Sequence, residues 1–181
     1  LMKTPLQKIN ILSIYKNSLG DMIPLPSRMA QCTPDTYRAI MNISKYLSEK
    51  GGKLILSDLF RSYDMQAQAN YDYISGKKSA YSPPPGGSFH EAGRAFDLDL
   101  GKIKISLAKF WELAAQYGVS PIISKPVIQS EAWHFDCRGS HQLVYDYYNS
   151  ISKEKRNMKP YEAMSVSAIT DHFDITFIRN I

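Results

Sequence analysis

The spacing of apolar residues predicts a helix early in the chain, over residues 35–49. Positions on one helix face recur every three to four residues, and here that face carries Tyr37, Ile40, Met41, Ile43 and Leu47. Thr33 and Pro34 are typical of a helix start, and the pair Gly51–Gly52 ends the element. Prolines interrupt residues 1–32, which are therefore predicted to be an irregular N-terminal arm wrapping the domain.

Two strands and a second helix are predicted in the middle of the chain. The apolar run over residues 53–59 indicates a strand, and a helix is expected to follow over 63–75. Residues 94–100 alternate, so that apolar side chains occupy one face and Asp97 and Asp99 the other. Residues 77–89, rich in proline and glycine, are expected to form the loop before this strand.

The second half of the chain continues this mixture of short helices and strands. We expect a helix up to residue 117, an extended segment at 121–130 and a strand at 133–137, then helices at 141–148 and 161–168 and a strand at 174–178. Because helices and strands do not alternate strictly, a single α+β domain with a central, mainly antiparallel sheet flanked by helices is favoured. Its motif-bearing core would span 54–138, with a C-terminal extension at 151–181.

Composition narrows the class of protein. The chain has 181 residues, of which 44% are hydrophobic and 22% charged, so disordered and fibrous classes are excluded. No apolar run approaches the roughly 20 residues of a transmembrane helix, and no signal peptide is recognisable. The formal charge of +5 suits an anionic polymer such as nucleic acid or bacterial wall, but solubility explains it equally well. Cys32 and Cys137 could form a disulfide or remain thiols.

Two histidines and one carboxylate form a candidate zinc site. A catalytic zinc takes three protein ligands from His, Asp and Glu and leaves a fourth position for water. His90, Asp97 and His134 would supply that set. Gly93 lies between the first two and would let the chain turn sharply, so that both reach one ion.

Two further charged residues are candidates for the chemistry around such a metal. Glu131 could act as general base, but strand alternation would put it on the face opposite His134, so this role requires a bend before Trp133. Arg61 follows an apolar strand and could hold a carboxylate or stabilise an oxyanion. Taken alone, either residue could equally be an ordinary surface charge.

Three strings of residues together resemble a known family. Its pattern is S-x-H-x-x-G-x-A-x-D, then E-x-W-H, with R-S-x-x-x-Q upstream, and here residues 88–97, 131–134 and 61–66 match these strings in order. The chain thus resembles the zinc D-alanyl-D-alanine carboxypeptidases of the vancomycin-resistance type and the related peptidoglycan endopeptidases. The similarity covers about residues 54–138.

The resemblance implies a role for each matched residue. His90, Asp97 and His134 would bind one Zn²⁺, Glu131 would be the catalytic base, and Arg61 would stabilise the tetrahedral intermediate. Ser88 and Gln66 would bind substrate or support the pocket. The implied substrates are the D-amino-acid stem peptides of peptidoglycan, and the implied reaction is removal of the terminal D-Ala. An extracytoplasmic location follows only from that substrate.

Other functions stay open on sequence grounds. An endopeptidase that cuts L-alanyl-D-glutamate or a cross-bridge would have the same zinc site. A non-catalytic zinc-stabilised binding domain would be expected to lack the base or the arginine, and both are present. A nucleic-acid partner is not expected, because no binding motif is recognisable. Asp99 shares a strand face with Asp97 and either orients a histidine or lies in solvent, while Asp136 is interpreted as structural.

Overall fold

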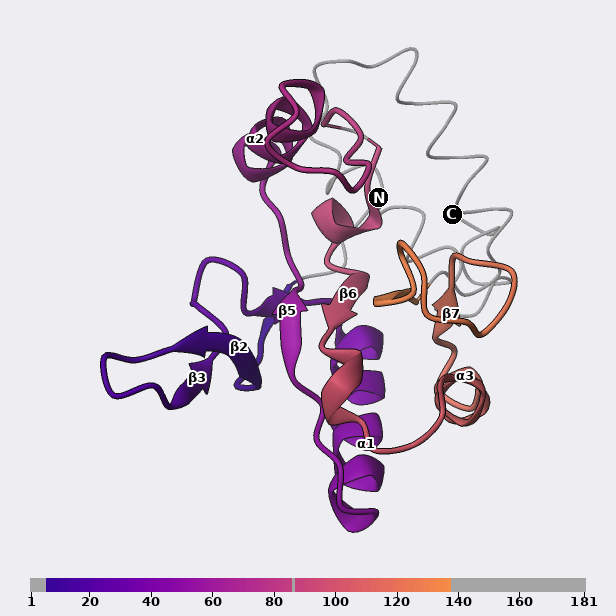
Figure 1. Cartoon of the computed structure of the whole chain (residues 1–181). Coiled ribbons are helices and arrows are strands. Elements are labelled where there is room, and N and C mark those ends of the chain that lie inside the picture. Colours follow the sequence, from indigo (N-terminus) through magenta and orange to yellow (C-terminus); the bar gives the residue numbers. More distant parts are fainter. Residues whose placement is uncertain (1–5, 86, 138–181) are drawn as a thin grey trace, which may run out of the picture.

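In the computed structural model, which describes residues 6–85 and 87–137, the chain folds around a six-stranded, mostly antiparallel sheet (Figure 1). Across the sheet the strand order is β3 (Met22–Pro24), β2 (Leu12–Lys16), β5 (Leu56–Asp58), β6 (Ala95–Leu98), β8 (His134–Asp136) and β7 (Ser120–Pro121). Only β2 and β5 pair in parallel; every other neighbouring pair is antiparallel. The predicted α+β fold with a mainly antiparallel sheet is confirmed.

Three α-helices accompany the sheet in the described part of the chain: α1 (Pro34–Glu49), α2 (Tyr63–Ile74) and α3 (Leu107–Ala115). Two short 3₁₀ helices, η1 (Phe89–Ala92) and η2 (Leu100–Lys102), flank β6. The helix bounds lie within two residues of those predicted. None of the described helices has the length and apolar character needed to cross a membrane.

The hydrophobic core lies between the sheet and helices α1 and α3. On α1, Ile40, Ile43 and Leu47 are fully buried, and the helix runs behind β5 and β6 in Figure 1. Phe110 of α3 meets Phe135 of β8 edge to face, with the ring centroids 4.8 Å apart. Helix α2 lies above the end of β5, where its Met65 packs against the core. The loop after α2, and not the helix itself, lines a cavity.

The N-terminal segment differs from the prediction of an irregular arm. It contains β2 and β3 of the main sheet and two further strands, β1 (Gln7–Lys8) and β4 (Gln31–Cys32), which pair with each other. Ser13 of β2 pairs with Leu56 of β5, so this segment extends the sheet. Proline did not prevent this, because a proline at a strand end or sheet edge costs no ladder hydrogen bond.

The segment before β8 also differs from its prediction. Residues 121–130 were expected to be extended, yet only Ser120–Pro121 forms a strand, and bends occupy residues 122–129. This loop is mostly exposed, so it lacks a neighbouring strand to hold it straight. The helices predicted at 141–148 and 161–168, the strand at 174–178 and the extension at 151–181 lie outside the described residues.

Both cysteines are buried free thiols. Burial is the largest cause of the raised pKa of each, which for Cys137 is about 12. The two thiols therefore stay un-ionised at neutral pH and act as small core side chains.

Candidate metal centre and its cavity

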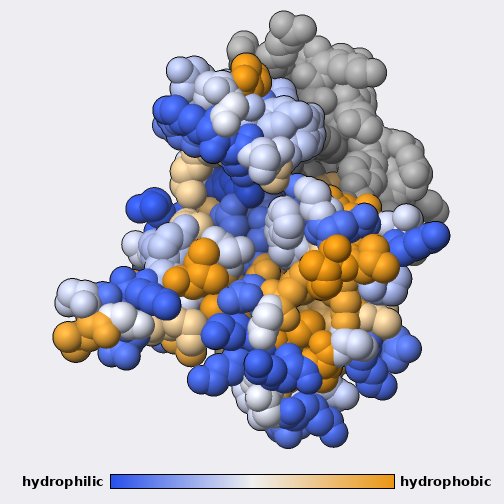
Figure 2. Space-filling view, in the orientation of Figure 1, coloured by the Kyte–Doolittle hydropathy of each residue, from blue (hydrophilic) through white to orange (hydrophobic). Residues whose placement is uncertain are grey.

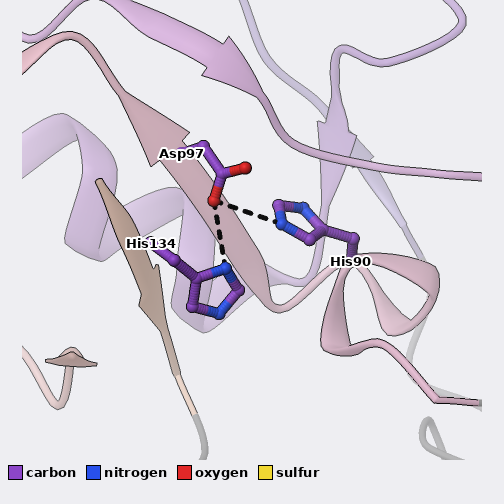
Figure 3. Close-up of side chains that lie close together, drawn as sticks. All are labelled: His90, Asp97 and His134. Atoms are coloured by element: carbon purple, nitrogen blue, oxygen red, sulfur yellow. Dashed lines mark hydrogen bonds and ion pairs between the residues drawn. The ribbon is translucent and has the colours of Figure 1, made fainter. Parts of the chain in front are cut away.

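Three of the predicted site residues converge from separate elements. His90 lies on η1, Asp97 on β6 and His134 on β8. The antiparallel register places Asp97 directly opposite His134, and η1 brings His90 to the same end of the sheet. One ligand atom from each side chain lies within 4.8 Å of the others, and both histidine rings point to the same oxygen of Asp97 (Figure 3).

The hydrogen bonds of η1 fix the orientation of His90. The Ser88 hydroxyl accepts from the backbone N–H of His90, and the Glu91 side chain accepts from the backbone N–H of Ser88, which completes a capping box. In the ring, Nδ1 lies 2.6 Å from the carbonyl oxygen of Leu59. Because a carbonyl only accepts, Nδ1 carries a proton, and Nε2 is the ring nitrogen that faces Asp97.

His134 is held between two carboxylates. Its Nδ1 lies 3.0 Å from Oδ1 of Asp97, and its Nε2 lies 3.0 Å from Oδ2 of Asp136, which is fully buried. Asp136 therefore orients the ring, a role that the sequence analysis missed when it treated this residue as structural. The available signal was strand alternation, which places Asp136 on the same face as His134. Asp99 instead caps η2 by accepting from Gly101.

Gly93 makes the close approach of His90 and Asp97 possible. Its φ is +70°, the left-handed conformation that glycine adopts without steric cost. A Cβ there would collide with the Leu6 side chain and lie 3.2 Å from the Cα of Cys32. The predicted sharp turn therefore depends on a residue without a side chain.

Burial and the neighbouring groups of the triad shift the pKa values of Asp97 and His134 in opposite directions. Burial alone raises the pKa of Asp97, but the two histidines outweigh it and hold this pKa below its usual range. Burial lowers the pKa of His134, but hydrogen bonds to Asp136 and Asp97 outweigh that and raise it to about 10. In the metal-free protein, a proton on His134 therefore balances part of the buried negative charge.

The donor set fits a divalent metal ion. Nε2 of His90 is buried and makes no hydrogen bond, although it lies 3.3 Å from Oδ1 of Asp97. A cation between these two acceptors would satisfy both. Two imidazole nitrogens and one carboxylate oxygen are ligands that zinc takes in catalytic sites. The triad could thus hold Zn²⁺, with Leu59 and Asp136 orienting the two rings from behind.

Glu131 lines the same cavity as the triad. Its φ of +70° is unusual for a residue with a side chain, and its carbonyl accepts from the backbone N–H of His134 in a tight turn. The bend that the sequence analysis required before Trp133 is therefore present. Burial, followed by the nearby charge of Asp97, raises the pKa of Glu131 above its ordinary value. A raised carboxyl pKa suits a group that accepts and returns a proton near neutral pH.

Arg61 also lines the cavity, and Asp58 holds it there. Oδ2 of Asp58 lies 2.6 Å from Nε and 2.5 Å from Nη2 of Arg61, so one carboxylate oxygen engages both. Nη1 donates to the amide oxygen of Gln66 at 3.1 Å. Asp58, which comes three residues before Arg61 at the end of β5, was not predicted to take part in the site.

Ser88 and Gln66 have different surroundings. Ser88 lines the cavity while its hydroxyl caps η1. Gln66 is fully buried, and it links Arg61 to the loop after α2 by donating to the carbonyl oxygen of Pro83 at 2.8 Å. It therefore supports the arginine from behind the cavity wall.

The cavity itself has a volume of about 730 Å³. Its walls come from the ends of β5 and β6, the loop after α2, η1 and the turn before β8. Figure 2 shows the surface below α2 as a hollow with mostly hydrophilic side chains. A cavity of this size admits a short peptide.

Comparison with known proteins identifies the fold. No family model matches the sequence, and no curated protein matches it. Among solved structures, the LdcB LD-carboxypeptidase, described for its peptidoglycan recognition, has a TM-score of 0.56 and 16% identity over 87% of this chain and 76% of its own. A zinc-bound mutant of the vancomycin-resistance D,D-pentapeptidase VanY has a TM-score of 0.50 and 14% identity over 81% and 86%. VanYB with D-alanine-D-alanine has a TM-score of 0.50 and 14% identity over 87% and 94%.

At such identities the likeness establishes the fold. The chain shares the fold of the LdcB LD-carboxypeptidase and of the D,D-pentapeptidase VanY, and the resemblance inferred from the three motifs is confirmed at that level. Within this fold a buried His–Asp–His triad that could bind zinc is present.

Proposed function

We propose that the protein is a zinc-dependent peptidase that hydrolyses D-amino-acid-containing stem peptides of peptidoglycan, with removal of the terminal D-Ala as its main reaction. The observation that carries this proposal is the convergence of His90, Asp97 and His134 at one end of a cavity that Glu131 and Arg61 also line. The shared fold supports it, because the similar structures include an LD-carboxypeptidase and a D,D-pentapeptidase. An extracytoplasmic location follows from the substrate.

His90, Asp97 and His134 would hold the zinc ion. When bound, zinc supplies a Lewis acid that polarises the scissile carbonyl and acidifies water. Glu131 takes a proton from the attacking water and returns it to the leaving amine, which its raised pKa favours. Arg61 donates hydrogen bonds to the oxygen on which negative charge develops. Asp58 and Gln66 keep the guanidinium in place for this step.

The test uses the full chain loaded with one equivalent of zinc and a stem pentapeptide ending in D-Ala-D-Ala. Mass spectrometry should show loss of a single D-Ala, and chelation should abolish the reaction. Internal cleavage between L-Ala and D-Glu would instead assign an endopeptidase, and the absence of any hydrolysis would refute the peptidase proposal.

Glu131→Gln and His90→Ala separate catalysis from metal binding. Glu131→Gln should keep stoichiometric zinc and lose about 10²- to 10⁴-fold in kcat, because the ligands remain and proton transfer does not. His90→Ala should lose the metal, which elemental analysis measures directly. Wild-type turnover by Glu131→Gln would show that another group is the base.

A further inference from the structure

Two positively charged side chains line the cavity beside the triad, Arg61 and Lys78. A cation at the binding site stabilises a peptide substrate that carries a carboxylate, because a charge-assisted hydrogen bond is stronger than a neutral one. The surroundings of these two residues decide which of them is available for that task.

The guanidinium of Arg61 has already engaged a carboxylate. Its Nε and Nη2 form the edge that normally grips a carboxylate with two parallel hydrogen bonds, and Asp58 occupies that edge. Nη1 contacts Gln66, and Nη2 lies 3.7 Å from Asp97. The N–H groups of Nη1 and Nη2 that are not used in these hydrogen bonds could donate to one developing oxyanion. A second, bidentate carboxylate would have to bind the Nη1–Nη2 edge, where Gln66 already accepts one hydrogen bond and Asp97 lies 3.7 Å from Nη2.

Lys78 is held at the cavity by the chain around it. Its backbone N–H donates to the carbonyl of Asp72 at 3.0 Å, which anchors it to the last turns of α2. Four residues further on, the carbonyl of Ser82 accepts from the Asn70 side chain of α2 at 2.8 Å. The loop that carries Lys78 is therefore fastened to the helix at both ends.

The ammonium of Lys78 has no paired carboxylate within residues 6–85 and 87–137. The residue is half-buried, and its charge reaches Glu131, since it is one of the influences that lower the pKa of that carboxyl against the larger effect of burial. A half-buried cation beside the reacting groups that has no paired carboxylate within the described residues has the chemistry to bind an anionic group.

We propose that Lys78 binds a carboxylate of the substrate next to the scissile bond and so determines which peptides the enzyme accepts. This inference rests on the proposed function. Two carboxylates of a stem peptide have this chemistry: the free C-terminus of the last D-Ala and the α-carboxylate of D-Glu when it is linked through its side chain.

The experiment compares matched peptides that differ in one carboxylate at a time. One pair ends in D-Ala acid or D-Ala amide, and a second pair carries D-Glu or its neutral amide. Lys78→Gln should raise KM about tenfold or more for the peptide that bears the recognised carboxylate and leave its neutral partner unchanged. Lys78→Arg should retain most of the preference. The pair that loses its discrimination identifies the carboxylate.

Lys77→Gln is the matched control. Lys77 is the neighbouring lysine, exposed and placed 5.7 Å from the ring centroid of Tyr71, and it does not line the cavity. Its replacement removes the same charge and should leave all four KM values unchanged. Equal effects of Lys77→Gln and Lys78→Gln would reduce the result to general electrostatic attraction and overturn the proposal.

Binding of the same peptides, measured by calorimetry, separates this proposal from the proposed function. A wild-type enzyme that binds the acid more tightly than the amide but hydrolyses neither would retain the Lys78 site and refute the peptidase. If the enzyme is active and Lys78→Gln changes the KM values of acid and amide peptides equally, or changes neither, the Lys78 site alone would be refuted.

Discussion

At the scale of single residues, the two histidines of the triad are prepared for a metal in different ways. The carbonyl of Leu59 holds His90 in the tautomer that presents Nε2 to the site. His134 instead holds protons toward two carboxylates, and those hydrogen bonds raise its pKa to about 10. Nε2 of His90 therefore faces the site without a hydrogen bond, whereas His134 must first release a proton to bind a metal.

This difference predicts a pH dependence of zinc binding. The His134 pKa is raised, so at neutral pH the metal-free site carries a proton that zinc must displace. Zinc affinity should therefore rise with pH, by about tenfold per pH unit for one displaced proton, up to about pH 10. Competition with a chelator of known affinity between pH 6 and pH 8 measures the slope. A flat profile would show that His134 is already neutral.

The two aspartates near the triad should respond differently to substitution. Asp136→Asn removes the charge behind His134 and should weaken zinc binding about 10- to 100-fold. Asp99→Asn is the matched control, because Asp99 caps η2 and does not contact a histidine. It should leave zinc affinity unchanged. Zinc titration gives both values, and circular dichroism verifies that each variant is folded.

At the scale of elements, the site depends on short irregular pieces between regular ones. Strands β6 and β8 place Asp97 and His134 opposite each other through ordinary antiparallel pairing. The 3₁₀ turn η1 and the turn at Glu131 bring the other groups, and both need a left-handed residue, Gly93 in one and Glu131 in the other. Backbone conformations of this kind cost free energy and occur often at functional sites.

Gly93→Ala should therefore damage both stability and metal binding. The left-handed φ costs an alanine about 1–2 kcal/mol, and crowding against Leu6 and Cys32 adds to it. Gly76→Ala is a matched control, because Gly76 has a φ of +82° and open space around it. Urea denaturation should show the greater loss of unfolding free energy for Gly93→Ala, and only this variant should lose zinc affinity. Equal losses would mean that crowding contributes nothing.

At the scale of the whole molecule, the metal site lies where the cavity end of the sheet meets the part of the sheet that the hydrophobic core covers. The apolar cluster packs α1 and α3 on the sheet, whereas α2 and η1 lie at the end of the sheet where the cavity opens. An ion bound by η1, β6 and β8 would link this end to the core. Any ligand that binds only the folded chain stabilises it by mass action.

Zinc should accordingly raise the melting temperature. At a free concentration 100 times its dissociation constant, a bound ion adds about 2.7 kcal/mol, which corresponds to a shift of several degrees for a chain of this size. Differential scanning calorimetry of the wild type with zinc or with chelator measures the shift. His90→Ala should melt at one temperature in both conditions, and an identical shift in that variant would place the stabilising ion elsewhere.

The sequence by itself determined the features that depend on neighbours in the chain. The first helix followed from the period of its apolar residues, and its bounds from Thr33–Pro34 and Gly51–Gly52. The turn at Gly93 followed from its lack of a side chain. The three motifs also predicted the shared fold, and they contain His90, Asp97 and His134, whose ligand atoms the structure brings within 4.8 Å of one another. These inferences were accurate because residue type and local spacing govern them.

Only the tertiary structure decided which partners each site residue has. Asp58 and Arg61 are close in sequence and in contact, and so are Asp136 and His134. Whether such pairs meet depends on the direction and burial of their side chains, which the packing of β5 and β8 decides. The pairing of β2 with β5 joins residues more than forty positions apart, so no local pattern predicted it. For the same reason, the position of Lys78 beside Glu131 became visible only when the loop after α2 and the turn at Glu131 were placed around one cavity.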